Sequence, residues 1–148
     1  MSDYKVGVGC GVVLFNEKGQ FVLMKRLSKH GFKTYAVPGG WIEYMESFED
    51  AARRESLEEI GVEIEKVKAI GVTNNFFPKE DRHTVTVVLA ARLKSRQVPK
   101  IMESEKCESI GWYDDWENLL EPMFCEYNKY VSKEDIANYL KWSEGVGK

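Results

Sequence analysis

Four glutamates and an arginine gather within 14 residues near the middle of the chain. They are Glu46, Arg54, Glu55, Glu58 and Glu59. At about 100° per residue, Glu55 and Glu59 lie one turn apart on a helix, with Glu58 on the flank of the same arc. Like charges at this spacing oppose one another by about 0.2–0.5 kcal/mol on an exposed helix. A cation on that helix face would remove the repulsion.

The cation that these ligands favour is Mg²⁺, with Mn²⁺ as its usual substitute. Oxygen ligands without histidine or cysteine suit hard ions, and Mg²⁺ commonly bridges carboxylates to substrate phosphates. The alternative is a solvated helix face that binds nothing, because the chain carries 24 acidic residues. Phe48 and Ala52 fall on the same helical stripe as Glu55 and Glu59, so the carboxylates continue an apolar face. This continuity favours the cation.

Capping signals place the helix over residues 48–60. Ser47 is a plausible N-cap residue, and Asp50 three positions later forms a weak capping box. Gly61 stands where a helix would end. A short strand over residues 34–37 would deliver Pro38-Gly39-Gly40 to the start of this helix.

This stretch resembles the Nudix box, G-x5-E-x7-R-E-U-x-E-E-x-G-U, in which U is a bulky apolar residue. The matching positions are Gly40, Glu46, Arg54, Glu55, Glu58, Glu59, Gly61 and Val62. Ser56 departs from the pattern at the first apolar position, and Met45 stands where many members carry glycine. Both departures bear on the seating of the helix more than on its chemistry. The chain is identified as a member of the Nudix hydrolase family.

The resemblance implies a metal site and its ligands. Glu55, Glu58 and Glu59 would bind one or more Mg²⁺, with the carbonyl of Gly39 as a common additional ligand. Glu55 and Glu58 are the expected catalytic residues, and Glu55 is the family's frequent choice for the base that activates water. Metal ions lower the pKa of bound water and neutralise phosphate oxygens, so hydrolysis of a phosphoanhydride becomes feasible near neutral pH.

Other residues of the box have structural roles in the family. Glu46 and Arg54 typically pair with each other and hold the loop to the helix, and Gly40 and Gly61 shape the backbone. Loss of Arg54 is therefore expected to act indirectly, by misplacing Glu55.

Residues outside the box are candidates for binding the substrate. Arg26 ends the second strand, where MutT-like members place a basic residue on the phosphates; the alternative is an exposed strand end. Glu108, or Glu105, would supply a ligand or base from beyond the box, unless each is a loop carboxylate. Phe76 is the candidate for stacking on a base. Phe77 and Trp116 are alternatives, although aromatic residues belong more often to the core.

Segments outside the box look like those of MutT-like nucleotide diphosphatases of plants and animals. The leading hypothesis is hydrolysis of nucleoside or deoxynucleoside triphosphates, including oxidised ones such as 8-oxo-dGTP, to the monophosphate and pyrophosphate. One alternative is an ADP-ribose, nucleoside diphosphate sugar or dinucleotide pyrophosphatase. Another is a non-catalytic nucleotide sensor, which the complete set of glutamates disfavours.

Composition predicts a globular, soluble protein. The chain has 148 residues, 43% of them hydrophobic, and its longest apolar runs are far shorter than a membrane span. Three cysteines without metal-site spacing indicate reduced thiols in a cytoplasmic protein. A net charge of −3 disfavours a nucleic acid polymer as ligand, so the expected partner is a small nucleotide. The sequence leaves open whether the chain forms a homodimer.

Strand and helix signals cover the rest of the chain. Strands are expected over residues 6–15, 21–25, 64–75, 83–93 and 108–113, the first two forming a hairpin. Helices are expected after Asp115 and after Ser132, packed against the protein's own sheet. The resemblance implies a single domain over residues 1–148 with the α/β/α Nudix sandwich, a mixed β-sheet between helices.

Overall fold

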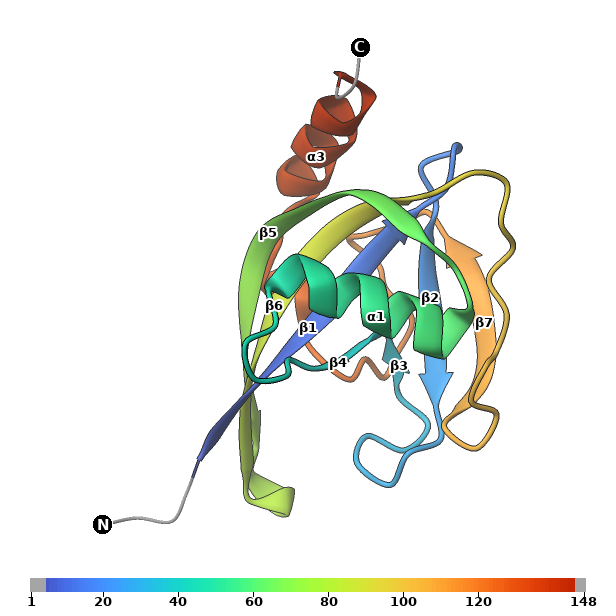
Figure 1. Ribbon diagram of the computed structural model, residues 1–148. Coiled ribbons are helices and arrows are strands. Elements are labelled where there is room, and N and C mark those ends of the chain that lie inside the picture. Colours follow the sequence, from blue (N-terminus) through green and yellow to red (C-terminus); the bar gives the residue numbers. More distant parts are fainter. Residues whose placement is uncertain (1–4, 146–148) are drawn as a thin grey trace.

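The computed structural model describes residues 5–145, which form one mixed sheet with helices on both faces (Figure 1). The strands are β1 (Val6–Phe15), β2 (Phe21–Arg26), β3 (Tyr35–Ala36), β4 (Gly39–Trp41), β5 (Ile64–Phe77), β6 (Arg82–Leu93) and β7 (Cys107–Tyr113). The helices are α1 (Phe48–Ile60), α2 (Tyr127–Tyr130) and α3 (Lys133–Gly145), and a single 3₁₀ turn, η1, spans Pro78–Glu80.

The sheet is mixed, as predicted. Its central path runs β3-β2-β1-β6-β5, with β4 paired to β1 and β7 paired to β2. β1 and β6 run parallel from Val6 opposite His83 to Phe15 opposite Arg92, and the other pairs are antiparallel. The predicted hairpin between β1 and β2 is confirmed at its turn, but Phe15 opposite Phe21 is its one paired position. Beyond that turn β2 pairs with β7 and β3.

Alternation along β1 divides the interior into two cores. Val12 and Leu14 belong to the core beneath α1, whereas Val13 and Phe15 belong to the core beneath α3. Tyr139 of α3 is almost fully buried and its ring stacks on Phe15. Figure 1 shows α1 lying across one face of the sheet. The helix–sheet–helix arrangement and the packing of the tail against its own sheet are confirmed.

The capping residues form α1 as its sequence predicts. The Ser47 hydroxyl accepts a hydrogen bond from the Asp50 N–H at 3.0 Å, which satisfies one of the free donors at the helix start. Gly61 adopts the left-handed conformation with φ 66°, and its N–H bonds to the carbonyl of Leu57 at 3.1 Å.

The helix predicted after Asp115 is wrong. The Asp115 carboxylate instead holds a turn by accepting hydrogen bonds from the backbone and side chain of Asn118. Further along, the Pro122 carbonyl and the Phe124 N–H bond to the backbone of Tyr35, so this segment is extended beside β3. Backbone groups engaged in this way are not free for a helix, which begins only at Tyr127.

The two departures from the box pattern leave α1 seated on the sheet. Met45 takes φ 64°, the left-handed conformation that favours glycine, and its side chain is exposed. The departure therefore raises the energy of the loop without moving the helix that follows. Ser56 is fully buried on the inner face of α1, and its hydroxyl has no hydrogen-bond partner among the described residues.

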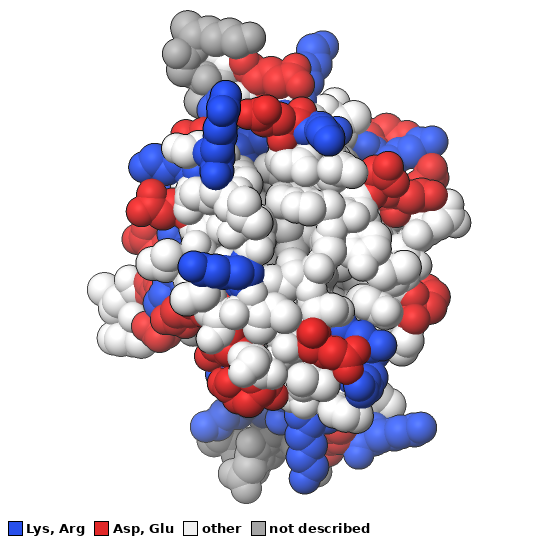
Figure 2. Space-filling model, turned by 90° about the vertical axis from the view of Figure 1, so that its right-hand side faces the viewer, with Lys and Arg blue, Asp and Glu red and all other residues white. Residues whose placement is uncertain are grey.

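Figure 2 shows the face of the molecule that carries the edge strand β7. Uncharged side chains cover most of its centre, and acidic and basic side chains are mixed around them. Among the described residues drawn there, basic side chains form no continuous stripe of the kind that binds a nucleic acid backbone. None of the helices within residues 5–145 has the length and apolar character needed to cross a membrane.

We predict that Ser56→Ala stabilises the protein by about 1 kcal/mol, because it removes a buried hydroxyl without a partner and favours helix. The matched control is Ser143→Ala, since Ser143 is equally buried but bonds to Arg92 and to the Leu140 carbonyl. That control is expected to lose about 1 kcal/mol or more. Urea unfolding measures both, and destabilisation by Ser56→Ala would contradict the interpretation.

Candidate active site

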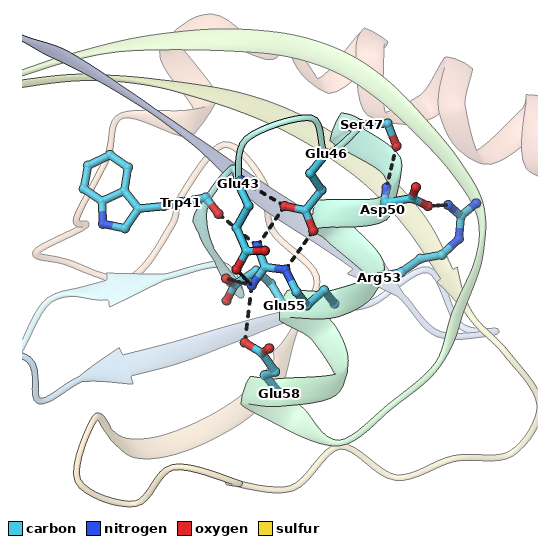
Figure 3. Close-up of polar contacts among 9 residues, drawn as sticks. Trp41, Glu43, Glu46, Ser47, Asp50, Arg53, Glu55 and Glu58 are labelled. Carbon is cyan, nitrogen blue, oxygen red and sulfur yellow. Dashed lines mark hydrogen bonds and ion pairs between the residues drawn. The ribbon is translucent and has the colours of Figure 1, made fainter.

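Arg54 bonds to a cluster of carboxylates between α1 and the loop that precedes it. Figure 3 labels the carboxylates of this cluster, Glu43, Glu46, Glu55 and Glu58. The Nε and Nη2 of Arg54 bond to the two oxygens of Glu46 at 2.8 and 3.0 Å, a bidentate pair. Its Nη1 bonds to Glu55 Oε1 at 2.7 Å and approaches Glu58 Oε2 at 3.4 Å. Nη2 also donates to the carbonyl of Trp41 at 3.0 Å. One side chain therefore joins β4, the loop and two glutamates of the helix.

The ion pair of Glu46 and Arg54 shifts the pKa values of both residues. Hydrogen bonds from Arg54, and then from the Glu43 N–H, lower the pKa of Glu46 to about 2. The bond to Glu46 in turn raises the pKa of Arg54 well above its usual value. Both groups therefore stay charged throughout the neutral range, as a structural pair requires.

Glu55 is withdrawn from water at the point where Gly40 lacks a side chain. Its side chain is 12% exposed, and a Cβ on Gly40 would lie 2.5 Å from Glu55 Oε1. A residue larger than glycine would displace the carboxylate. Burial raises the pKa of Glu55, while the hydrogen bond from Arg54 acts in the opposite direction.

Glu59 is the most deeply buried carboxylate of the set. Its Oε1 accepts a hydrogen bond from the Gly39 N–H at 2.6 Å, which ties α1 to β4. Burial raises its pKa to about 8, because this one hydrogen bond offsets little of the lost hydration, and the nearby charge of Glu55 adds to the effect. A divalent cation would reverse this shift, since it stabilises the ionised form.

Glu58 differs from its two neighbours because 54% of its side chain is exposed. Within residues 5–145, no three acidic, histidine or cysteine side chains converge as closely as a bound metal ion requires. The reason is visible in the contacts: Arg54 holds Glu55 and Glu58, and the Gly39 amide holds Glu59. The oxygen donors nevertheless fit Mg²⁺. The contact of Glu58 with Arg54 is the longest of these at 3.4 Å, so the exposed Glu58 side chain can turn from Arg54 toward a cation shared with Glu55 and Glu59.

A cavity of about 300 Å³ opens on the other side of β4. Its wall includes Gly39 and Gly40, the two residues that touch Glu59 and Glu55. Other residues of the wall are Arg26, His30, Trp41, Thr84, Phe124 and Tyr127. The cavity and the carboxylates therefore share one short strand, β4.

Arg26 is the predicted substrate residue that the structure brings into the cavity. Its guanidinium lies over the Phe124 ring, 4.0 Å from the centroid, and donates two hydrogen bonds to the His30 carbonyl. His30 itself pairs with Glu80 and packs edge-on against Phe77. These contacts hold a cation at the cavity wall with donors left for a ligand.

Two predicted substrate residues do not reach the cavity. Phe76 is 66% exposed and its ring lies against His83, because adjacent residues of a strand face opposite sides and it is Phe77 that contacts Phe124. Glu108 forms ion pairs with Lys25 and Lys33, and the bond from Lys33 lowers its pKa. Glu105, the alternative to Glu108, is exposed.

Two residues of this region were missed in the sequence. Glu103 contributes to the raised pKa of both Glu55 and Glu59, and the neighbouring Met102 N–H bonds to the Glu59 carbonyl at 3.1 Å. Glu103 therefore joins Glu105 and Glu108 as a candidate carboxylate from outside the box. Trp41 follows the two glycines and lines the cavity. Its position directly after Gly39 and Gly40 could have indicated in the sequence that Trp41 lies near the site.

Comparison with known proteins places the chain in a family. Residues 5–134 match the NUDIX domain model. The chain is 29% identical over 101 residues to an 8-oxo-dGTP diphosphatase of Proteus vulgaris, covering 68% of this chain and 88% of that protein. It is 39% identical over 136 residues to an NAD-capped RNA hydrolase of Schizosaccharomyces pombe, covering 92% of this chain but 30% of that longer protein.

A solved structure agrees with the sequence comparison. The MutT NUDIX hydrolase of Burkholderia pseudomallei superposes with a TM-score of 0.72 at 27% identity, over 80% of this chain and 90% of that one. The chain belongs to the NUDIX family and is a MutT-like Nudix hydrolase, as the sequence predicted.

The raised pKa of Glu59 predicts an unusual pH dependence for the metal-free protein. Between about pH 4.5 and about pH 8 the folded state keeps a proton that the unfolded state has lost, so stability falls as pH rises through this window. We expect a loss of about 1–2 kcal/mol between about pH 6 and pH 8, measured by urea unfolding in chelator. Glu59→Gln retains the acceptor for Gly39 and should flatten this slope; an unchanged slope would refute the assignment.

Arg54→Lys is expected to lower activity or metal affinity by about 10–100-fold, because lysine cannot form the bidentate contact to Glu46 while also holding Glu55. Steady-state kinetics measures the loss. Arg53→Lys is the matched control, since Arg53 is exposed and pairs with Asp50 alone. Equal activity of the two variants would show that Arg54 does not position Glu55.

Proposed function

We propose that this Nudix hydrolase cleaves a phosphoanhydride bond of nucleoside or deoxynucleoside triphosphates, oxidised ones such as 8-oxo-dGTP included, to give the monophosphate and pyrophosphate. The observation that carries the proposal is the carboxylate face of α1 beside the cavity that contains Arg26. A triphosphate is strongly negative, and a metal ion on the carboxylates together with the guanidinium of Arg26 would bind its phosphates. The 8-oxo-dGTP diphosphatase of Proteus vulgaris, which aligns over most of its own length, supports this class of substrate.

Glu55, Glu58 and Glu59 would hold Mg²⁺, or Mn²⁺ in its place, with the Gly39 carbonyl as a further ligand. When bound, the metal neutralises phosphate oxygens and lowers the pKa of coordinated water. Glu103 is an additional candidate ligand because it lies close enough to perturb Glu55 and Glu59.

The chain's own residues supply positioning and proton transfer. Arg26 would bind a phosphate oxygen, with its guanidinium held by Phe124 and the His30 carbonyl. Glu55 would accept the proton of the attacking water, since it is buried and Arg54 fixes one of its oxygens. The second oxygen of Glu55 remains for this role.

A second candidate is hydrolysis of a dinucleotide or another linked nucleoside diphosphate. The NAD-capped RNA hydrolase of Schizosaccharomyces pombe favours it, because the identity of 39% extends over 92% of this chain. This chain spans 30% of the length of that protein.

The three cysteines support a reducing compartment. Cys10, Cys107 and Cys125 are all buried and none forms a disulfide. We infer a cytoplasmic protein from this pattern.

Incubation with Mg²⁺ and a panel of canonical and oxidised triphosphates, dinucleotides and ADP-ribose tests the proposal. We expect monophosphate and pyrophosphate from triphosphates, loss of activity in EDTA, and recovery with Mg²⁺. Glu59→Gln should abolish turnover, whereas the control Glu49→Gln, in the first turn of the same helix, should not. Cleavage of linked diphosphates alone would establish the second candidate, and activity that persists in chelator would refute the metal-dependent mechanism.

A further inference from the structure

One aromatic residue of the cavity wall is Trp41, which directly follows Gly39 and Gly40. Trp41 belongs to β4, yet 54% of the residue is exposed. An indole left this open to water retains a large apolar area that a flat ligand would cover.

Glycine on β1 provides the seat for this indole. A Cβ on Gly7 would lie 2.5 Å from Trp41 Cζ3 and 2.8 Å from Cη2, so the six-membered ring rests directly on the backbone of the strand. Gly9, which pairs with Trp41 across the strands, also lines the cavity. One side of the indole is thus supported by β1, and its remaining surface is available to a ligand.

The backbone of Trp41 is tied to the carboxylate cluster. Its carbonyl accepts a hydrogen bond from Arg54 Nη2 at 3.0 Å, and Arg54 Nη1 holds Glu55 at 2.7 Å. Figure 3 shows the indole projecting away from this cluster while the carbonyl faces it. One guanidinium therefore fixes the separation between the indole and the reactive carboxylates.

The remaining walls offer polar groups to the edge of a flat ring. Thr84 and Thr86 line the cavity, and the Asn75 amide donates to their hydroxyls at 3.1 and 3.0 Å. The Thr84 hydroxyl then keeps its proton for another acceptor, whereas the Thr86 hydroxyl also bonds to the Cys125 thiol. Arg26 adds a cation at the wall. A ligand with an aromatic face, a hydrogen-bonding edge and attached phosphates fits this combination.

We propose that Trp41 is a substrate-binding residue that stacks on the nucleobase and favours purines over pyrimidines because of their larger rings. The inference rests on the proposed function, since it takes a nucleotide as the ligand. It transfers the stacking role from Phe76, whose ring lies against His83 outside the cavity, to Trp41. Stacking at Trp41 holds the base while the phosphates extend toward Glu55 and Glu59.

Tryptophan fluorescence tests stacking without hydrolysis. GMP is titrated into the metal-free protein, and we expect quenching in the wild type and in Trp142→Phe but not in Trp41→Phe. Trp142 is the matched control because it is a partly exposed tryptophan on α3, where it contacts Tyr139 and Lys68. Quenching that survives in Trp41→Phe would overturn the proposal.

Kinetics on the panel of nucleotides supplies the second test. Trp41→Ala should raise KM for purine nucleotides about 10-fold or more, with a smaller change in kcat and a smaller effect on pyrimidine nucleotides. Trp41→Phe should restore most of the affinity, and Trp142→Ala should leave KM unchanged. An unchanged KM in Trp41→Ala would refute the inference while leaving nucleotide hydrolysis intact. Trp41-dependent quenching by GMP in a protein that hydrolyses no nucleotide would support stacking and refute the proposed function.

Discussion

The bidentate contact between Arg54 and Glu46 is the interaction on which the site depends. Through this one guanidinium the loop before α1, the carbonyl of Trp41 and the carboxylate of Glu55 are held in fixed positions. Two carboxylates of the helix lie largely out of water, which is unfavourable for isolated charges. The fold tolerates this because Arg54 and the Gly39 amide each satisfy one of them, and the remaining electrostatic cost favours a cation at the same place.

The sequence predicted the parts of this site that are local. The helix over residues 48–60 follows from Ser47, Asp50 and Gly61, whose caps form within a few residues of one another. The role of Gly40 as a structural residue has a plain cause, because the Glu55 carboxylate occupies the space of a side chain. Spacing on a helix is a short-range property, so one sequence is sufficient to read it.

The parts that the sequence did not predict depend on contacts between distant segments. The helix expected after Asp115 is absent because the segment bonds to Tyr35, about 90 residues earlier in the chain. Phe76 and Phe77 are adjacent, and only the register of β5 against β6 decides which of them faces Phe124. Glu103 was missed because the Met102 N–H bonds to the Glu59 carbonyl near the end of α1, a contact between distant segments, whereas the resemblance to the family suggested Glu105 and Glu108. The position of the Trp41 indole depends on its contact with Gly7 on β1, which the sequence does not show.

Binding of a divalent cation by Glu55, Glu58 and Glu59 is the proposal on which the function of this site depends. Calorimetric titration of Mn²⁺ at about pH 7, repeated in buffers of different ionisation enthalpy, measures this binding. Since burial raises the pKa of Glu59 to about 8, we predict that binding releases up to about one proton and that Glu59→Gln abolishes both binding and proton release. Mn²⁺ binding of undiminished affinity in Glu59→Gln, or no binding to the wild type, would refute this metal site.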